Sequence, residues 1–487
     1  MGAGPAFVMK HILIIVVFIA TLMPLAWKAV SDSPYGYDEA DYMYAAKLGL
    51  VANHTDTPTM HLKEFLRTGL RRGRDPSQGA QLSELIRGSN DVLFYRHWHG
   101  PLYFYWLVLT SHLDLDEHGM RLFTLAFPIC SLLIIYTGCI WIFGETQGTV
   151  AAILGSALFV WSMPTVRSAE LAPHQAFVCS LLACLVLLSK FVGTGIRWYL
   201  YGAAVAAALS CCLLEVGCVT VATVVVCAYL ERRKLGSHSN WEIPLLLGFV
   251  ATVFVVWSGA IVKLSFVKSY LFMAYLALYR KAPWGPEGLI ETWTRRVFSS
   301  PVEWLVIGVG LLIWIFLRRI EGDRRVMYPF VVFGALMLVT TVRVTTGTPR
   351  YALMFQPSLD VLAGCMLAAF LVRFARPAVP FTLAILSFLL FTEMWLNVQR
   401  YPVLPDTRLS SLLSYIRENH LENSRMLVPQ LDLPTLHYYF PNSHLRGYID
   451  PIPEVSTFRE KETEGVIYPG LPIQYEPPLS RSLNGTK

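Results

Sequence analysis

The chain enters its first apolar segment at residues 11–29, HILIIVVFIATLMPLAWKA, and leaves it through residues 30–42, VSDSPYGYDEADY. A helix that spans a bilayer needs about 20 mostly apolar residues, so this segment is long enough to cross one. A cleaved signal peptide is the competing interpretation, but the segment lacks a clear small-x-small cleavage site and many apolar runs follow it. We therefore expect a retained first transmembrane helix.

The composition places the whole chain in a membrane. Of its 487 residues, 54% are hydrophobic and 15% are charged, and the mean hydropathy is +0.47. Soluble domains carry about 25% charged residues. The formal net charge of +6 is small and follows membrane orientation, so it indicates no nucleic-acid partner. All nine cysteines lie in apolar runs, which predicts neither a disulfide framework nor a zinc knuckle.

Further apolar runs follow a long polar stretch that extends from residue 31 to about residue 120. They cover residues 121–143, 149–164, 172–191, 197–213, 216–230, 243–264, 301–318, 327–343, 352–372 and 379–396. Basic residues in alternate short loops predict a cytoplasmic N-terminus. Basic clusters flank both ends of residues 197–230, so an even number of crossings separates them and Glu215 marks a tight outer hairpin. The sequence thus predicts an all-α polytopic membrane protein with about 11 transmembrane helices.

This topology divides the chain into two domains. Residues 1–396 form the transmembrane domain, whose long first extracytoplasmic loop, 31–120, carries interfacial helices. Residues 397–487 form a small extracytoplasmic α/β module, with helices expected at 409–416 and 433–439 and a strand at 425–428. A polytopic transporter is an alternative, but we find neither paired glycine-broken helices nor charges in the middle of several spans.

Two adjacent carboxylates, Asp38 and Glu39, follow the first span at the water–lipid boundary. A membrane-held substrate presents its headgroup there, and a carboxylate can remove a proton from an acceptor hydroxyl. Its neighbour can orient a sugar hydroxyl or bind a cation. The alternative is a solvated acidic patch that begins an amphipathic helix.

A second group is His97-Trp98-His99-Gly100-Pro101-Leu102, followed by an aromatic run. Aromatic belts are common at this depth of a membrane, so a structural role is the alternative. Together with the acidic pair, the histidines could supply a site for a divalent metal ion, with Glu39, His97 and His99 as candidate ligands.

A third feature is Arg350, in Pro349-Arg350-Tyr351, on the outer side of the tenth span. This position opposes the positive-inside trend and suits a lipid phosphate, which arginine binds bidentately. Snorkelling to bulk headgroups is the alternative. Arg167 and Lys281 are weaker candidates of the same kind.

The order of these motifs resembles the GT-C glycosyltransferases of the protein-mannosyltransferase and aminoarabinose-transferase type. The resemblance covers about residues 31–143 and 343–373. It is carried by the run Asp38-Glu39-Ala40-Asp41-Tyr42, by His99-Gly100-Pro101-Leu102-Tyr103, by Glu117-His118-Gly119-Met120-Arg121-Leu122-Phe123 and by Pro349-Arg350-Tyr351. The chain departs from the family at Gly100, where a proline is common, and at Leu214-Glu215, where Thr-Lys is frequent.

The resemblance implies an inverting glycosyltransferase of the bacterial inner membrane, with its C-terminus outside the cytoplasm. Its donor is a sugar linked to a polyprenyl phosphate, and its acceptor is a hydroxyl of a lipid, glycan or protein. Asp38 is then the catalytic base and Glu39 orients the sugar or a cation. Binding of the donor phosphate and substrates is assigned to His99, Arg350, Tyr351, Asp41, Tyr42, His97, Arg167 and Lys281. A catalytically inactive relative of these enzymes is a further alternative.

Overall fold

The computed structural model describes residues 5–47, 49–55, 99–167, 170–235, 240–262, 289–341, 349–403, 405–429 and 432–448. The long apolar helices are α1 (Pro5–Ala29), α8 (Ala126–Phe143), α9 (Glu145–Val160), α11 (His174–Thr194), α12 (Arg197–Cys211), α13 (Gly217–Leu230), α15 (Glu242–Val256), α19 (Pro301–Phe316), α20 (Glu321–Thr341), α22 (Gln356–Phe374) and α23 (Val379–Arg400). Each of the predicted apolar runs therefore contains a helix. This is expected in lipid, where a helix satisfies its own backbone hydrogen bonds.

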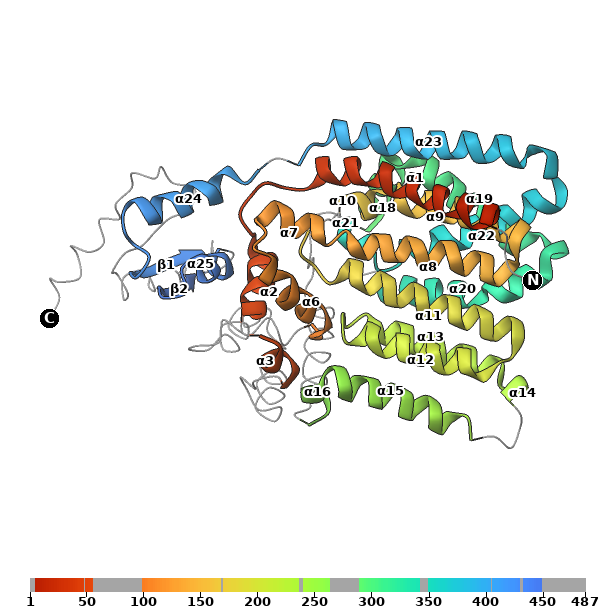
Figure 1. The fold of residues 1–487 in the computed structure, drawn as a ribbon, viewed down its shortest axis with the longest axis horizontal. Helices are drawn as coiled ribbons and strands as arrows, with labels where there is room; N and C mark the ends of the chain where they lie inside the picture. The colour runs from red at the N-terminus through yellow and green to blue at the C-terminus, as the bar shows by residue number, and fades with distance from the viewer. Residues whose placement is uncertain are drawn as a thin grey trace.

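Five segments of the described residues are long and apolar enough to cross a membrane. They are Val8–Ala29, Glu117–Phe143, His174–Thr194, Gln356–Phe374 and Arg376–Arg400. Shorter apolar helices cover Gly217–Leu230, Glu242–Val256 and Pro301–Phe316. The chain is thus a helical membrane protein, whose long helices lie side by side with their axes nearly parallel (Figure 1).

Small residues let the central helices of this bundle approach closely. A Cβ atom on Gly364 of α22 would lie 2.5 Å from the backbone nitrogen of Gly155 in α9. A Cβ on Gly310 of α19 would lie equally close, 2.5 Å, to the Cα of Ala363. Lipid supplies no hydrophobic drive between helices, so close backbone packing of this kind holds such bundles together. Helix α22 is therefore the centre of the bundle.

Two acidic side chains are buried between α19 and α22. Glu303 is 1% exposed and Asp360 is 0% exposed. The side-chain amide of Gln356 donates to Glu303 Oε1 at 2.5 Å. Both acids lie within the first five residues of their helices, so they sit near one end of the bundle and form no charged path through it.

The short helices gather at the end of the bundle opposite the N-terminus (Figure 1). In the first loop these are α2 (Tyr37–Lys47), α3 (Gly49–Thr55), α6 (Leu102–Thr110) and α7 (Glu117–Phe123). Others are α10 (Met163–Arg167), α14 (Arg232–Leu235), α16 (Ser258–Val262), α18 (Leu289–Ser299) and α21 (Pro349–Ala352), of which α14 lies at the N-terminal end. Within the described ranges, 3₁₀ turns cover Ser111–Leu113, Arg318–Ile320 and Arg376–Ala378.

The last described elements are α24 (Thr407–Glu418), β1 (Arg425–Pro429), α25 (Leu433–Tyr439) and β2 (His444–Tyr448). The two strands pair in parallel, with Arg425 opposite His444. Parallel neighbours need a crossover connection, which α25 supplies. Apolar side chains of α24, α25 and the strands form a separate small core.

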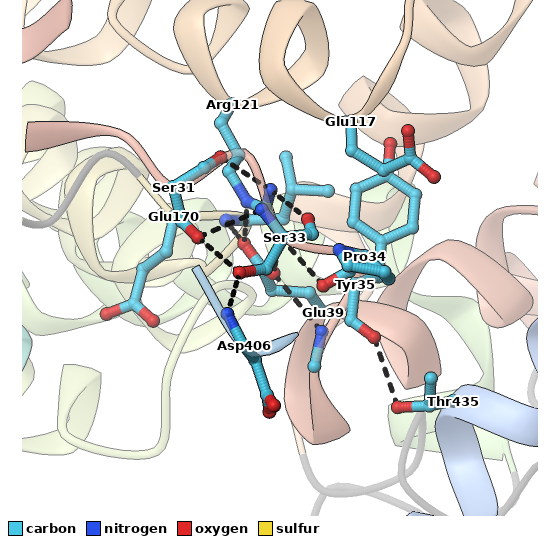
Figure 2. Close-up of polar contacts among 12 residues, drawn as sticks. Ser31, Ser33, Pro34, Tyr35, Glu39, Glu117, Arg121, Glu170, Asp406 and Thr435 are labelled. Carbon is cyan, nitrogen blue, oxygen red and sulfur yellow. Dashed lines mark hydrogen bonds and ion pairs between the residues drawn. The ribbon is translucent and has the colours of Figure 1, made fainter. Parts of the chain in front are cut away.

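This C-terminal group docks on α2. The Tyr439 hydroxyl accepts from the backbone nitrogen of Tyr35 at 3.0 Å and donates to Glu117 at 2.8 Å. The Thr435 hydroxyl donates to the Tyr35 carbonyl at 3.1 Å (Figure 2). At the other end of α2, Lys47 donates to the Tyr438 carbonyl at 3.1 Å. The helix that follows the first span is therefore fixed from outside the bundle.

Candidate active site

Helix α2 carries Asp38 and Glu39 in its first turn. Acidic side chains are favoured there, because the first backbone N–H groups of a helix have no partner within it. Consecutive residues on a helix point about 100° apart, so the two carboxylates face different neighbours. The Asp38 side chain is 29% exposed, whereas that of Glu39 is 11% exposed.

Glu39 is held by Arg121 of α7 (Figure 2). The Arg121 Nε donates to Glu39 Oε1 at 2.8 Å, and its Nη2 donates to Oε2. The backbone nitrogen of Leu171 adds a third bond to Glu39, at 3.0 Å. Arg121 also donates to the carbonyl oxygens of Ser31, Ser33 and Pro34, which lead into α2. We call this buried group the Arg121 anchor.

Asp38 is paired with a second arginine, Arg350 of α21. The Arg350 Nη2 donates to Asp38 Oδ2 at 2.6 Å and to the Tyr351 hydroxyl at 3.3 Å. Its Nη1 donates to Glu170 at 3.5 Å. Asp38, Glu170 and Arg350, which we call the Arg350 cluster, come from three distant parts of the chain. All three side chains retain contact with solvent, at 29%, 33% and 17% exposed respectively.

Burial and neighbouring charge shift the protonation of this cluster. The pKa of Glu170 is raised from its ordinary value of 4.5 to about 7. Burial raises it most, Arg350 lowers it, and the nearby carboxylates Glu39 and Asp38 add to the rise. Burial by itself lowers the pKa of Arg350, but Glu170 and Asp38 raise it, so the guanidinium stays charged. The site therefore joins one permanent cation to a carboxyl group that titrates near neutral pH.

An ion pair between His99 and Glu215 lies next to this cluster. The His99 Nδ1 is 3.0 Å from Glu215 Oε1. The His99 ring also lies 5.7 Å from the ring of Tyr42, which is buried on the same helix as Asp38. Burial lowers the pKa of His99, but the charge and hydrogen bond of Glu215 raise it above its ordinary value. A histidine whose charged form is favoured by a neighbouring carboxylate thus borders the Arg350 cluster.

No family model and no curated protein matches the sequence. Solved structures do match the fold. The structure of ArnT from Cupriavidus metallidurans bound to undecaprenyl phosphate is 12% identical, with a TM-score of 0.56 over 94% of this chain and 89% of that one. ArnT from the same organism in the apo state has a TM-score of 0.55 and 12% identity over 91% of this chain and 87% of that one.

This chain has the GT-C fold. The archaeal oligosaccharyltransferase of Archaeoglobus fulgidus, solved as a complex with Zn and sulfate, also matches, at 13% identity and a TM-score of 0.48. That match covers 90% of this chain and 59% of that one. The two ArnT structures alone cover 94% and 91% of this chain, so the similarity extends to the arrangement of helices over most of it.

Within the GT-C fold, the remaining predicted site residues lie in different places. Tyr351 lies beside the Arg350 cluster, where its hydroxyl accepts from Arg350, and its ring is 5.4 Å from that of His174. Asp41 is buried, 3% exposed, on α2. Arg167 donates to the carbonyl oxygens of Asn397 and Tyr401, at the end of α23. His97 and Lys281 lie outside the described residues.

The predicted metal ligands have other partners where the structure describes them. Glu39 accepts from Arg121, and His99 Nδ1 contacts Glu215. Across the described ranges, no group of three or more His, Cys, Asp or Glu side chains could hold a metal ion. Any site that includes His97 involves a residue outside those ranges.

Sequence reasoning missed three residues that the GT-C fold brings to this end of the bundle: Glu170, Arg121 and Glu215 in its contact with His99. Glu170 lies just before an apolar run and Arg121 lies just inside one. A charged residue at the edge of a predicted span was the available signal, because such residues are expensive in lipid unless they have a partner. A charged residue at the edge of a span indicates that a partner exists, but it does not identify that partner.

Proposed function

We propose that this protein is an inverting glycosyltransferase that moves a sugar from a polyprenyl-phosphate donor to an acceptor hydroxyl outside the cytoplasm. The observation that carries the proposal is the Arg350 cluster, in which a partly exposed carboxylate and a guanidinium lie 2.6 Å apart at one end of a GT-C fold. The match to a structure of ArnT bound to undecaprenyl phosphate supports the class of donor.

The chemistry requires a base on one side of the anomeric carbon and positive charge on the other. In the proposed reaction Asp38 accepts the proton of the acceptor hydroxyl, whose oxygen attacks the anomeric carbon. The bond to the phosphate oxygen breaks, and Arg350 and His99 stabilise the phosphate that leaves. Attack from the side opposite the phosphate inverts the configuration.

A donor phosphate that binds Arg350 replaces Asp38 as the hydrogen-bond acceptor of the guanidinium. Asp38 is then released to accept a proton, so binding of the donor prepares the base. Glu170, which contacts the other nitrogen of the same guanidinium, orients it from a second direction. Tyr42 and Tyr351, both beside the cluster, complete the proposed substrate surface together with Asp41.

For Glu39 we propose a positioning role, because both of its oxygens already accept hydrogen bonds from Arg121. The Arg121 anchor joins the residues that precede α2 to α7, and α2 carries Asp38. Glu39 then affects catalysis indirectly, because it fixes the position of α2 and thereby that of Asp38.

The proposal includes a topology. About eleven spans place the N-terminus in the cytoplasm of a bacterial cell and the site and the C-terminal α/β module outside the inner membrane. Reporter fusions at Gly322 should then read cytoplasmic, and fusions after Leu409 should read extracytoplasmic. Both ends of the chain on one side of the membrane would contradict the hairpin at Glu215.

The decisive experiment is an assay of the purified protein with a set of polyprenyl-phosphate sugars and candidate lipid, glycan and protein acceptors. Release of the lipid phosphate reports turnover, and the anomeric configuration of the product reports inversion. Release by the wild type and its loss in Asp38→Asn would support the proposal. No release with any donor would contradict it. The same assay after chelation, followed by return of divalent cations, tests for a metal ion.

A further inference from the structure

His99 and Glu215 lie on segments that are 116 residues apart in the sequence. His99 precedes α6, and Glu215 lies in the turn between α12 and α13. The ring Nδ1 is 3.0 Å from one carboxylate oxygen and 3.1 Å from the other. The side chains are 18% and 9% exposed respectively, so this is a mostly buried pair and not a contact at the surface. Water therefore weakens it little.

The backbones of the two segments pack in direct contact around this pair. The backbone nitrogen of Leu102 donates to the Cys212 carbonyl at 3.1 Å. A Cβ on Gly100 would lie 2.2 Å from that same carbonyl oxygen, so only glycine fits between the segments. Gly217 makes a similar approach on the other side of the turn, where a Cβ would lie 2.4 Å from the nitrogen of Cys211. This packing leaves the two side chains little freedom to separate.

Charged and titratable groups from several elements act on the His99 ring. Glu215 and Asp38 favour its charged form, and Arg350 opposes it. The ring of Tyr42, on α2, packs against the His99 ring. His174, at the start of α11, is close enough to interact electrostatically with His99. Glu215 has the largest favourable effect of these groups, because it is in direct contact.

We infer that Glu215 is a positioning residue that orients His99 and holds it as an imidazolium beside the Arg350 cluster. When Nδ1–H donates to Glu215, the proton on Nε2 is the one that the ring can offer to an anion. The inference rests on the proposed function, in which that anion is the phosphate of the lipid donor. It makes the affinity for phosphate depend on pH through a residue that touches no substrate.

The test measures binding of farnesyl phosphate, a short polyprenyl monophosphate, to the full-length protein in detergent micelles from about pH 5 to about pH 9. In the wild type, affinity falls as pH rises through the pKa of His99. Glu215→Gln keeps the shape and removes the charge, so this fall should move to lower pH. Between the two midpoints, the affinity of the variant should fall behind that of the wild type by about tenfold for each pH unit, and below both midpoints the two should bind alike.

A matched control is Glu231→Gln. Glu231 lies at the other end of α13, is 7% exposed and is paired with Lys234 and Arg325. Its replacement removes the same kind of buried, paired charge far from the site, so the midpoint should not move. Titration of the ligand's own phosphate affects every protein equally and cancels in the comparison.

A midpoint that stays in place in Glu215→Gln, with affinity reduced equally at all pH values, would show a merely structural contact and overturn the inference. If that variant does not fold, His99→Gln decides, because the imidazolium and its fall in affinity should both disappear. Persistence of the fall in His99→Gln overturns the inference as well. A wild type that binds no farnesyl phosphate at any pH removes the proposed function and this inference together, whereas binding with an unmoved midpoint removes only the inference.

Discussion

The first turn of α2 contacts two arginine–carboxylate groups, and they differ in burial and in hydrogen bonding. In the Arg121 anchor, the guanidinium is 3% exposed and donates five hydrogen bonds, to Glu39 and to backbone carbonyls. In the Arg350 cluster, the guanidinium is 17% exposed and its hydrogen bonds extend to 3.5 Å. Its Nε is buried without a partner among the described residues.

This difference separates a structural role from a chemical one. A buried charge that has every partner it needs stabilises one conformation and has nothing left to offer a ligand. A cation that is only partly satisfied, and that water reaches, can exchange a carboxylate for a phosphate. Asp38 and Glu39 are neighbours with the same functional group, and the arginine that each one meets decides its role.

The largest expected effect is on activity, from Asp38→Asn. The change is nearly isosteric and removes the charge of one partner of a partly exposed ion pair, so it should alter the free energy of unfolding by no more than about 1 kcal/mol. Loss of a general base should reduce sugar transfer by about 10²–10⁴-fold. Release of lipid phosphate and the melting temperature are measured on the same preparation. Full activity would transfer the role of base to Asp41.

Arg121→Met should have the next largest effect, on stability. It leaves Glu39 buried without its cation, and removal of one partner of a buried pair costs about 3–5 kcal/mol. We expect low yield and a much lower melting temperature in detergent. Arg350→Met is the matched control and should melt close to the wild type. Equal melting temperatures for the two variants would remove the distinction between the anchor and the cluster.

Arg350→Ala should weaken donor binding. A hydrogen bond to a charged group contributes roughly 1.5–3 kcal/mol, which corresponds to a loss of about ten- to a hundredfold in donor affinity. Arg350→Lys should recover only part of it, because lysine keeps the charge but lacks the planar fork that matches two phosphate oxygens. Titration of the lipid-linked sugar at fixed acceptor gives the donor constants. Equal constants for the wild type and both variants would mean that Arg350 only contacts bulk headgroups.

The smallest expected effect concerns Glu170 and pH. Its pKa is raised from 4.5 to about 7 in the folded protein, first by burial. As pH rises through this interval, the unfolded chain releases a proton that the folded chain retains, so Glu170 makes the folded state less stable with rising pH. Below about pH 4.5, Glu170 does not change the stability of the folded protein with pH. Above about pH 7, the loss of stability that it causes is complete and no longer changes with pH.

Glu170→Gln does not titrate and should remove this loss. Its melting temperature relative to the wild type should therefore be higher near pH 8 than near pH 4. Thermal melts at the two pH values measure the difference. A difference that is the same at both would mean that the carboxyl group keeps its ordinary pKa in the folded protein.

Local sequence patterns predict the helices, and they single out Asp38 and Arg350 as candidate site residues. Every apolar run contains a helix, and Asp38 and Arg350 each lie just outside a predicted span, which is what makes them candidates. Their contact, between residues 312 apart, was not visible in the sequence. Glu170 and Glu215 likewise contact side chains that are 180 and 116 residues away in the sequence. Arg167, chosen by the same criterion as Arg350, instead contacts the end of α23.

The sequence by itself determined that this chain lies in a membrane as a set of helices, since lipid leaves an apolar segment no other way to satisfy its backbone. It also determined that two carboxylates follow the first helix. Only the tertiary structure decided that Glu39 is enclosed by Arg121 while Asp38 meets Arg350 in contact with water. The reason is that the role of a charge depends on its burial and its partners, and both come from helices that are distant in the sequence and adjacent in the fold.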